Sequence, residues 1–229
     1  MNLIILFVQM QSDKQLAVGV VILAAGASRR MGRQKLLLPW GKTTVLGHLL
    51  EQWTRLGARE IAVVCATNAG DVEDELDRLS RLAPSRGQKP SPIFNPAPDR
   101  GMFSSIQCAA KWPAWNAELT HWLVTLGDQP HLKEETLRTL LNCGAANPER
   151  ICQPLRSGHR KHPVLFPKAL FAELKNTSAG DLKIFLMEHA KYLVGFESDD
   201  AGLDLDMDTP EDYERLFRAS FIKPSSASL

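Results

Sequence analysis

Basic side chains gather in a loop that follows a short apolar run near the N-terminus. Residues 20–23 (VVIL) predict a buried parallel strand, and residues 24–28 (AAGAS) are all small. The cations that follow are Arg29, Arg30, Arg33 and Lys35. Small side chains let backbone N–H groups approach an anion while the cations neutralise it, so this stretch favours a polyphosphate ligand. It contains neither the Gly-Lys-Ser/Thr of a P-loop nor the Gly-x-Gly-x-x-Gly of a dinucleotide fingerprint.

A carboxylate stands directly after a second apolar run. Asp128 follows residues 122–126 (WLVTL), which predict a buried strand, and it lies in the tetrapeptide Gly-Asp-Gln-Pro. Ligands of open α/β sheets bind beyond the carboxyl ends of the strands, so this carboxylate is a candidate ligand for a hard metal ion. A lone Asp at the end of a strand just as often caps the next helix, and on these residues alone both interpretations stay open.

Three further carboxylates alternate with apolar residues in the segment LDLDMDTPED. Asp204, Asp206 and Asp208 would share one face of a strand over residues 203–207. Three like charges on one face repel one another unless a cation or a basic group lies near them. The segment is therefore either a second metal-binding element or an edge strand with a solvated acidic face.

Two other segments carry polar groups that could recognise a ligand. Gly101 precedes Ser104 and Ser105 at the start of a predicted helix, where hydroxyl and N–H groups could contact a base or a sugar, or could simply cap the helix. His159 and His162 flank Arg160-Lys161. Because no third metal ligand accompanies this H-x-x-H spacing, we interpret it as a basic patch near an anionic acceptor.

Composition restricts the classes of protein to which the chain can belong. Its 229 residues are 44% hydrophobic, which suits one large or two small globular α/β domains. A net charge of +1 gives no indication of nucleic acid or an anionic membrane as a partner. The four cysteines form no C-x-x-C pair, which favours reduced thiols and a cytoplasmic location. The apolar run at residues 3–8 is too short to span a bilayer, so we interpret residues 1–17 as an N-terminal extension.

The order of predicted elements indicates an α/β fold with a mostly parallel sheet. Strands are predicted at 18–23, 60–66, 93–94 and 122–126, alternating with helices at about 44–56, 68–82, 101–111 and 133–146 and with a surface loop over 84–92. Residues 151–153 and 162–166 are predicted to pair as a small antiparallel insertion around a turn at 155–160, of the kind that often covers one end of a parallel sheet. Helices at 168–174 and 181–189, a strand at 192–196 and a helix from Thr209 to about Ala219 complete a single domain over residues 18–220, followed by a loose tail at 221–229.

Several of these segments resemble the motifs of the MobA-like nucleotidyltransferases. Residues 23–39 are similar to the pattern LAAGxSxRMGxxKLLLP of the molybdenum cofactor cytidylyltransferase branch, and LGDQP at 126–130, DTPED at 208–212, GMFSS at 101–105 and HPVLF at 162–166 are similar to other family segments. The resemblance covers residues 18–217. It implies a three-layer α/β/α fold with a Rossmann-like, mostly parallel sheet of the glycosyltransferase-A type.

The resemblance also implies a role for individual residues. Arg30 and Lys35 would hold the phosphates, and the backbone of Leu23, Ala24, Ala25 and Gly26 would approach the nucleotide. Asp128 would bind Mg²⁺, and Asp206 or Asp208 would supply a second metal contact; the motif does not decide which. Ser105, with Ser104 as the next candidate, would contact the cytosine.

The acceptor side is less similar to the family than the nucleotide side. Gln129 matches the cytidylyl rather than the guanylyl branch, and Gln129 and His162 would lie near the acceptor. Lys161 replaces a usual Gly, and Gly180-Asp181-Leu182-Lys183 departs from the family's Gly-Asp-x-Gly-Ala-Arg. The resemblance therefore defines the nucleotide more closely than the acceptor.

The activity that the resemblance implies is Mg²⁺-dependent transfer of CMP from CTP to the phosphate of molybdopterin, as molybdenum cofactor, with release of pyrophosphate. A molybdoenzyme apoprotein would be a further partner. Two alternatives are nucleotidyl transfer to a sugar or polyol phosphate, or from GTP, and a non-catalytic carrier of the molybdenum cofactor.

Overall fold

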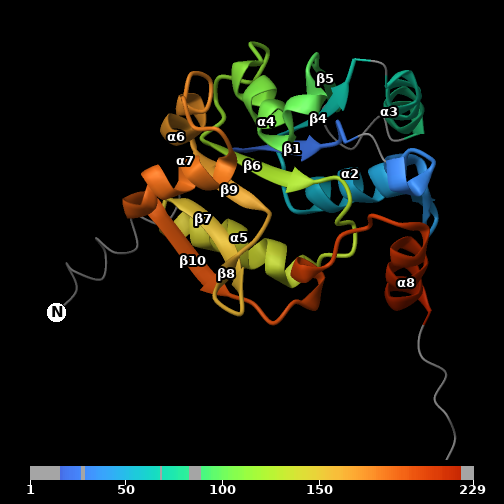
Figure 1. The fold of residues 1–229 in the computed structure, drawn as a ribbon. Helices are drawn as coiled ribbons and strands as arrows, with labels where there is room; N and C mark the ends of the chain where they lie inside the picture. The colour runs from blue at the N-terminus through green and yellow to red at the C-terminus, as the bar shows by residue number, and fades with distance from the viewer. Residues whose placement is uncertain (1–15, 27–28, 68, 83–88, 223–229) are drawn as a thin grey trace, which may run out of the picture.

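The computed structural model describes residues 16–26, 29–67, 69–82 and 89–222. Within these residues one eight-stranded sheet has the order β10-β7-β9-β6-β1-β4-β5, and β8 pairs with β7 beside this path (Figure 1). The strands are β1 (Val18–Leu23), β4 (Glu60–Ala66), β5 (Ser91–Asn95), β6 (His121–Leu126), β7 (Ile151–Arg156), β8 (His159–Arg160), β9 (Val164–Pro167) and β10 (Leu193–Glu197). All the pairings in the path are parallel except those of β9 with β6 and β7. The predicted mostly parallel α/β sheet is therefore confirmed.

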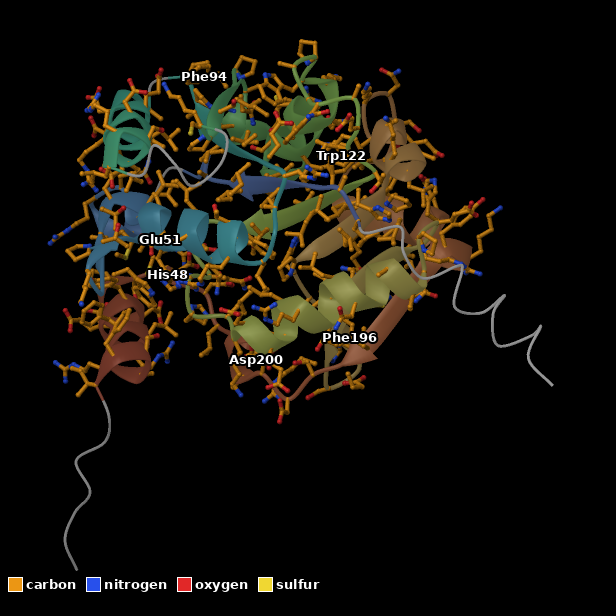
Figure 2. All side chains as sticks on the ribbon, turned by 180° about the vertical axis from the view of Figure 1, so that it is seen from behind. His48, Glu51, Phe94, Trp122, Phe196 and Asp200 are labelled. Carbon is orange, nitrogen blue, oxygen red and sulfur yellow. The ribbon has the colours of Figure 1, made fainter. Side chains whose placement is uncertain are left out.

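Helices cover both faces of the sheet, which gives the three layers expected. Apolar side chains of α2 (Val45–Arg55), α3 (Gly70–Leu82) and α5 (Glu134–Ala146) pack into one core, whereas those of α4 (Met102–Lys111), α6 (Lys168–Glu173) and α7 (Leu182–Glu188) pack into another. Seen from behind, Phe196 and Asp200 lie on the α5 side of the sheet (Figure 2). No helix in the described part of the chain has both the length and the apolar character needed to cross a membrane.

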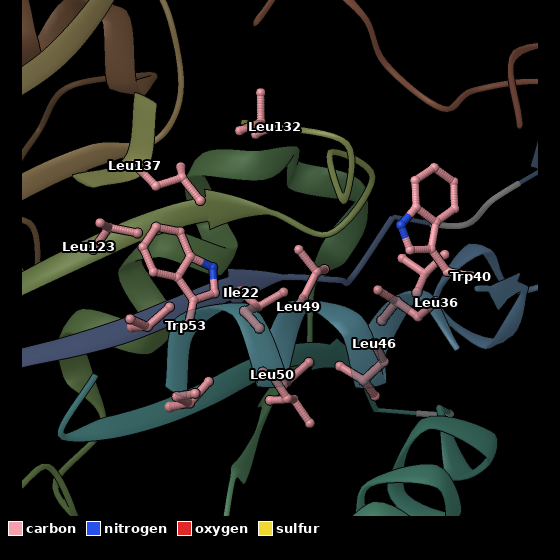
Figure 3. Close-up of a cluster of buried hydrophobic side chains, with 14 of the residues drawn as sticks. Ile22, Leu36, Trp40, Leu46, Leu49, Leu50, Trp53, Leu123, Leu132 and Leu137 are labelled. Carbon is pink, nitrogen blue, oxygen red and sulfur yellow. The ribbon is translucent and has the colours of Figure 1, made fainter. Parts of the chain in front are cut away.

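The central strand β1 is buried along its whole length because helices cover it from both sides. Ile22 faces the first core and packs with Leu49 and Trp53 of α2, as Figure 3 shows. Val21 faces the second core with Ile106 of α4. A strand that is apolar on both faces is what a continuous run such as VGVVIL predicts. This rigid centre fixes the position of the loop that follows Leu23.

The antiparallel part of the fold lies inside the sheet rather than over one end of it. β9 pairs with β6 through Leu123 and Leu165, and Leu165 also lies opposite Cys152 of β7. The predicted pairing of 151–153 with 162–166 is confirmed by these contacts. β7 also extends to Arg156 and forms a tight hairpin with β8, whose turn places Ser157 and Gly158 at positive φ angles of 50° and 76°.

The predicted strand over residues 203–207 is wrong. Ala201–Asp204 forms a 3₁₀ turn, and no strand follows it before α8 (Pro210–Phe221). The buried Asp200 carboxylate causes the turn: it accepts hydrogen bonds from Gly202 N at 2.9 Å, from Lys133 N at 3.0 Å and from Thr136 Oγ1 at 2.9 Å. Asp204, Asp206 and Asp208 therefore do not share one strand face, and each has a different partner.

The helix α8 begins as predicted. Thr209 Oγ1 accepts from Asp212 N, the Asp212 side chain accepts from Thr209 N, and Pro210 occupies the first turn. The helix continues to Phe221, two residues beyond the predicted Ala219, where the Phe217 and Phe221 rings pack edge-on against Trp40 of β2 (Pro39–Trp40). Most of the predicted extension at 1–17, of the tail at 221–229 and of the loop at 84–92 lies outside the described residues. The extent of the domain remains a prediction.

Candidate active site

Three segments that are distant in the sequence meet at the carboxyl edge of the sheet. β1 and β6 are parallel neighbours with Leu23 opposite Leu126, so the loop after β1 and Asp128 leave the sheet side by side. Gly127 N donates to Leu23 O at 3.0 Å, and a Cβ on Gly127 would lie 2.8 Å from that oxygen, so only glycine permits this approach. Met207 N donates to Asp128 O at 3.3 Å, which brings the third segment to the same place.

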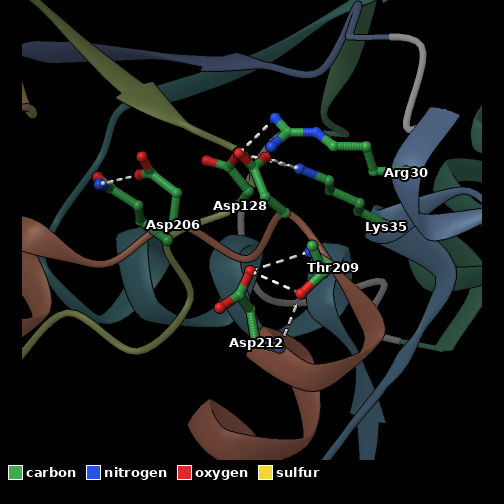
Figure 4. A network of polar contacts seen from close by, with 8 residues as sticks. Arg30, Lys35, Asp128, Asp206, Thr209 and Asp212 are labelled. Atoms are coloured by element: carbon green, nitrogen blue, oxygen red, sulfur yellow. Dashed lines mark hydrogen bonds and ion pairs between the residues drawn. The ribbon is translucent and has the colours of Figure 1, made fainter.

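Cations and carboxylates from these segments form one network (Figure 4). Lys35 Nζ lies 2.6 Å from Asp208 Oδ1 and 3.4 Å from Asp128 Oδ2. Arg30 Nη2 lies 2.6 Å from the other oxygen, Asp208 Oδ2. The Lys35 side chain is 14% exposed and that of Arg30 is 68% exposed. The predicted phosphate-binding cations and two of the predicted metal ligands are therefore in direct contact.

The two carboxylates beside Lys35 have opposite pKa shifts. Burial raises the pKa of Asp128 above its ordinary value, and the negative charges of Asp206 and Asp208 add to this, although Lys35 opposes it. The hydrogen bond from Lys35 lowers the pKa of Asp208, and the charges of Lys35 and Arg30 lower it further. Asp128 thus carries its charge at a cost that a further cation would relieve.

Asp206 differs from its neighbours because its partner is an amide. Gln129 Nε2 donates to Asp206 Oδ1 at 3.0 Å, and the Gln129 side chain is buried while Asp206 is exposed. Among the described residues no basic side chain forms an ion pair with Asp206. The network therefore brings three carboxylates together with two cations, an excess of negative charge that suits one divalent metal ion.

The donor set agrees with a hard metal that shares its ligands with a substrate. In the described part of the chain no three His, Cys, Asp or Glu side chains are grouped as ligands for a metal ion. Two carboxylate ligands, with the remaining positions filled by phosphate oxygens and water, are typical of Mg²⁺ sites.

A small cavity of about 70 Å³ opens beside the network. Its walls include Leu23, Ala24, Gly26, Lys35 and Asp128, which are five of the residues predicted to bind the nucleotide. Ala24 N already donates to Val64 O at 2.8 Å, so this backbone group is engaged within the protein. The loop turns at Arg29–Met31 and Lys35–Leu37, where short 3₁₀ helices direct Arg30 and Lys35 toward Asp208.

The structure does not bring Ser104 and Ser105 to the wall of this cavity. Both side chains are buried at the start of α4, and Asn95 Nδ2 donates to their hydroxyl oxygens at 2.8 and 2.9 Å. Ser104 lines a separate cavity of about 340 Å³ with Arg100 and Thr177. Sequence reasoning missed Asn95; an Asn at the end of a strand and before a Pro was the available signal.

The two residues predicted for the acceptor, Gln129 and His162, both interact with Asp206. Burial lowers the pKa of His162, while the Val124 carbonyl and Asp206 act in the opposite direction, so the ring is neutral at pH 7. Gln129 Oε1 and His162 Nδ1 are buried, and neither has a hydrogen-bond partner among the described residues. These two atoms are available to a bound water or to a polar ligand.

The predicted basic patch is partly neutralised within the protein. Lys161 Nζ lies 2.6 Å from Asp204 Oδ1, and Arg156 Nε lies 3.3 Å from Asp204 Oδ2. His159 and Arg160 are exposed on β8. Sequence reasoning missed the pairing of Asp204 with these two cations because it assigned Asp204 to the same strand face as Asp206 and Asp208.

Comparison with known proteins finds a family model that matches most of the chain. Residues 20–192 match the family model of the MobA-like NTP transferase domain. The molybdenum cofactor cytidylyltransferase of Escherichia coli (strain K12) is 29% identical over 201 residues, which cover 86% of this chain and 94% of that protein. The nicotine blue oxidoreductase of Paenarthrobacter nicotinovorans is 30% identical over 206 residues, again covering 86% and 94%.

A solved structure extends the comparison to three dimensions. The crystal structure of Rv0371c from Mycobacterium tuberculosis H37Rv in complex with manganese has a TM-score of 0.61 and 25% sequence identity. The match covers 89% of this chain and 99% of that one. The same arrangement of layers is therefore present in a structure that contains a divalent cation.

Proposed function

The chain belongs to the MobA-like NTP transferase family and is a nucleotidyltransferase, and from this premise we propose that it transfers CMP from CTP to the phosphate of molybdopterin, as molybdenum cofactor, with release of pyrophosphate. The observation that carries the proposal is the contact of Lys35 with both Asp208 and Asp128, at 2.6 and 3.4 Å. One cation and two carboxylates from three segments meet where a metal and a triphosphate would be bound together. The 29% identity to a cytidylyltransferase supports CTP and the molybdenum cofactor as the first substrates to test.

The protein's part in such a reaction is to position the substrates and to stabilise charge. Arg30 and Lys35 bind the phosphates and offset the negative charge that develops on the leaving pyrophosphate. The acceptor phosphate attacks the α-phosphorus in line with the leaving group, the new P–O bond forms as the bond to pyrophosphate breaks, and CMP is transferred. The attacking phosphate is already ionised at pH 7, so no general base is required. Alignment of the two phosphates supplies much of the rate enhancement.

A divalent ion, for which we propose Mg²⁺, would be held by Asp128 together with Asp206 or Asp208. When bound, it supplies positive charge that polarises phosphate oxygens. Asp128 fits this role because burial raises its pKa, so a bound cation would stabilise its charged form. Asp206 fits because it is exposed near Asp128 and has no basic partner among the described residues. Asp208 is engaged with Lys35 and Arg30, so it would join the metal only after leaving them.

The nucleobase and the acceptor are assigned to opposite sides of the network. Ser104 and Ser105 act on the cytosine side by fixing Asn95 and the start of α4, since their own hydroxyls are buried in that hydrogen-bond cluster. Gln129 and His162 act on the acceptor side, where Gln129 Oε1 and His162 Nδ1 lack partners among the described residues. The enzyme is assigned to the cytoplasm, and a molybdoenzyme apoprotein is the proposed recipient of its product.

The experiment is an assay of pyrophosphate release with the purified full chain. CTP and GTP are each tested with molybdenum cofactor and with sugar or polyol phosphates, with Mg²⁺, with Mn²⁺ or with excess EDTA. We expect release with CTP, molybdenum cofactor and a divalent ion. Release with another pair of substrates and none with this pair would show that the substrate assignment is wrong.

Residues 180–183 depart from the acceptor segment of the family, so the same assay also tests a second candidate acceptor, a sugar or polyol phosphate. A non-catalytic cofactor carrier would instead bind molybdenum cofactor without any turnover, and Asp128→Ala would leave that binding unchanged.

A further inference from the structure

Asp208 forms ion pairs with both cations that the proposed function assigns to the triphosphate. Each of its oxygens has its own partner, Lys35 Nζ at 2.6 Å and Arg30 Nη2 at 2.6 Å. The carboxylate therefore contacts the two cations as a phosphate group would, with one oxygen for each. Figure 4 shows Arg30 and Lys35 converging on the same point from the loop after β1.

A carboxylate in this position competes with any other anion. The Lys35 side chain is only 14% exposed, so its ammonium group has few other places to find a hydrogen-bond acceptor. A polyphosphate that binds Lys35 and Arg30 must displace Asp208 or share the cations with it. Displaced, Asp208 would be a free carboxylate beside Asp128, Asp206 and the phosphates, and repulsion among these anions would oppose binding.

We propose that Asp208 is a specificity-determining residue that holds Arg30 and Lys35 until a metal-loaded triphosphate arrives, and so excludes metal-free polyphosphates. The inference rests on the proposed function, because it assumes that the two cations bind the triphosphate. A divalent ion carried by the nucleotide would offset the negative charge of the displaced Asp208 carboxylate. Metal-free CTP, tripolyphosphate and pyrophosphate supply none, so Asp208 weakens their binding.

The chain contains a matched control in the same segment. Asp204 also bonds one lysine and one arginine, Lys161 at 2.6 Å and Arg156 at 3.3 Å, but Arg156 ends β7 and Lys161 directly follows β8. Asp204→Asn therefore removes the same charge from the same segment without freeing Lys35 or Arg30. Any effect of net charge alone is the same in Asp204→Asn and Asp208→Asn.

The experiment measures binding of CTP and of inorganic tripolyphosphate by calorimetry, in EDTA and in Mg²⁺, for the wild type and both variants. In EDTA we expect Asp208→Asn to bind tripolyphosphate about 10-fold more tightly than the wild type, since two partly exposed ion pairs and one repulsive charge are removed. Asp204→Asn should stay within about twofold of the wild type, as expected for a distant surface charge. The gain in CTP affinity on adding Mg²⁺ should be smaller in Asp208→Asn than in the wild type.

The possible outcomes separate this inference from the proposed function. If the wild type binds both ligands but Asp208→Asn binds metal-free tripolyphosphate no more tightly than Asp204→Asn, only the inference about Asp208 is wrong. If no protein binds CTP or tripolyphosphate in either buffer, both are wrong. Thermal unfolding verifies that each variant is folded, and Asp208→Ser provides the same comparison should the Asn variant be unstable.

Discussion

Two ion-pair clusters in this molecule are built alike, and the structure gives them different surroundings. In one, Asp208 bonds Lys35 and Arg30; in the other, Asp204 bonds Lys161 and Arg156. Each has a Lys–Asp contact of 2.6 Å, and the hydrogen bond from its lysine lowers the pKa of each Asp. The two aspartates are four residues apart. The lysine contacts therefore do not distinguish a site from a surface cluster, although the arginine contact is shorter for Asp208, at 2.6 Å, than for Asp204, at 3.3 Å.

The difference lies in what surrounds the ion pairs. The Asp208 cluster lies where β1 and β6 end, and it includes the half-buried Asp128 and, through Gln129, the exposed Asp206. The Asp204 cluster joins the 3₁₀ turn to a hairpin, although its Arg156 lines a much larger cavity of about 560 Å³. A surplus of carboxylates at converging strand ends, rather than the size of the cavity, identifies the candidate active site.

The largest expected contrast between the clusters is in turnover. Asp128→Asn keeps the shape of the side chain but removes the half-buried charge that would hold the metal, so we expect a loss of about 10³-fold in the rate of pyrophosphate release. Asp204→Asn should stay within about twofold of the wild type. Equal losses in the two variants would contradict the assignment of Asp128 to the reacting centre.

The two lysines offer the next test. Lys35→Met should lower kcat and raise the KM for CTP, with kcat/KM reduced about 10²-fold, because this ammonium contacts both carboxylates of the proposed site. Lys161→Met removes the matching cation from the other cluster and should leave the KM for CTP unchanged. Steady-state kinetics with CTP as the varied substrate measures both, and a raised KM in Lys161→Met would show that the hairpin also contacts the nucleotide.

Asp206 allows the metal assignment to be tested without turnover. Because Asp206 has no basic partner among the described residues and lies near Asp128, Asp206→Asn should weaken Mn²⁺ binding about 10-fold. Electron paramagnetic resonance of free Mn²⁺ measures the affinity directly, and Asp204→Asn again serves as the control. Unchanged Mn²⁺ affinity in Asp206→Asn would leave Asp208 as the partner of Asp128.

The sequence was sufficient to predict the part of the Asp208 cluster that depends on the parallel strands β1 and β6. Apolar runs ending at Leu23 and Leu126 predict neighbouring strand ends, and parallel pairing brings the loop at Lys35 and the carboxylate of Asp128 to one edge. Alternation of Asp and apolar residues at 203–208 suggested a strand instead, because the pattern contains no sign that Asp200 would fold back onto Lys133 and Thr136. Contacts with residues distant in the sequence determine the 3₁₀ turn at residues 201–204.

The serine pair illustrates the same limit. Ser104 and Ser105 stand at a helix start, where a hydroxyl is equally suited to a ligand and to the protein itself. Asn95, at the end of β5, takes both hydroxyls as acceptors, and nothing local to residues 101–106 indicates this contact. Side-chain hydrogen bonds between elements depend on tertiary packing, which periodicity does not report.

A third carboxylate, Glu75, also has basic and hydroxyl partners, but it lies outside both clusters and stabilises the fold. Glu75 of α3 accepts from Arg78 Nε at 2.6 Å and from Thr44 Oγ1 at 2.7 Å, and Thr44 is also the N-cap of α2. Hydrogen bonds from Arg78 lower the pKa of Glu75 below its ordinary value of 4.5, and the bond from Thr44 contributes. Glu75 is 8% exposed, so its hydrogen bond with Thr44 joins α3 to the start of α2 in a largely buried position.

Glu75→Gln should therefore reduce the free energy of unfolding by about 1.5 kcal/mol at pH 7, the lower end of the range for a hydrogen bond to a charged group, because Arg78 is partly exposed. Because the folded pKa of Glu75 is depressed, this contribution is present above the ordinary value of 4.5 and is lost as the pH falls below it toward the folded pKa. Urea unfolding from pH 7 to pH 3 measures the effect, and the wild type and Glu75→Gln should converge in acid. Asp204→Asn, whose ion pairs are exposed, should follow the wild type throughout, whereas a constant difference between Glu75→Gln and the wild type would show that packing, not charge, links α3 to α2.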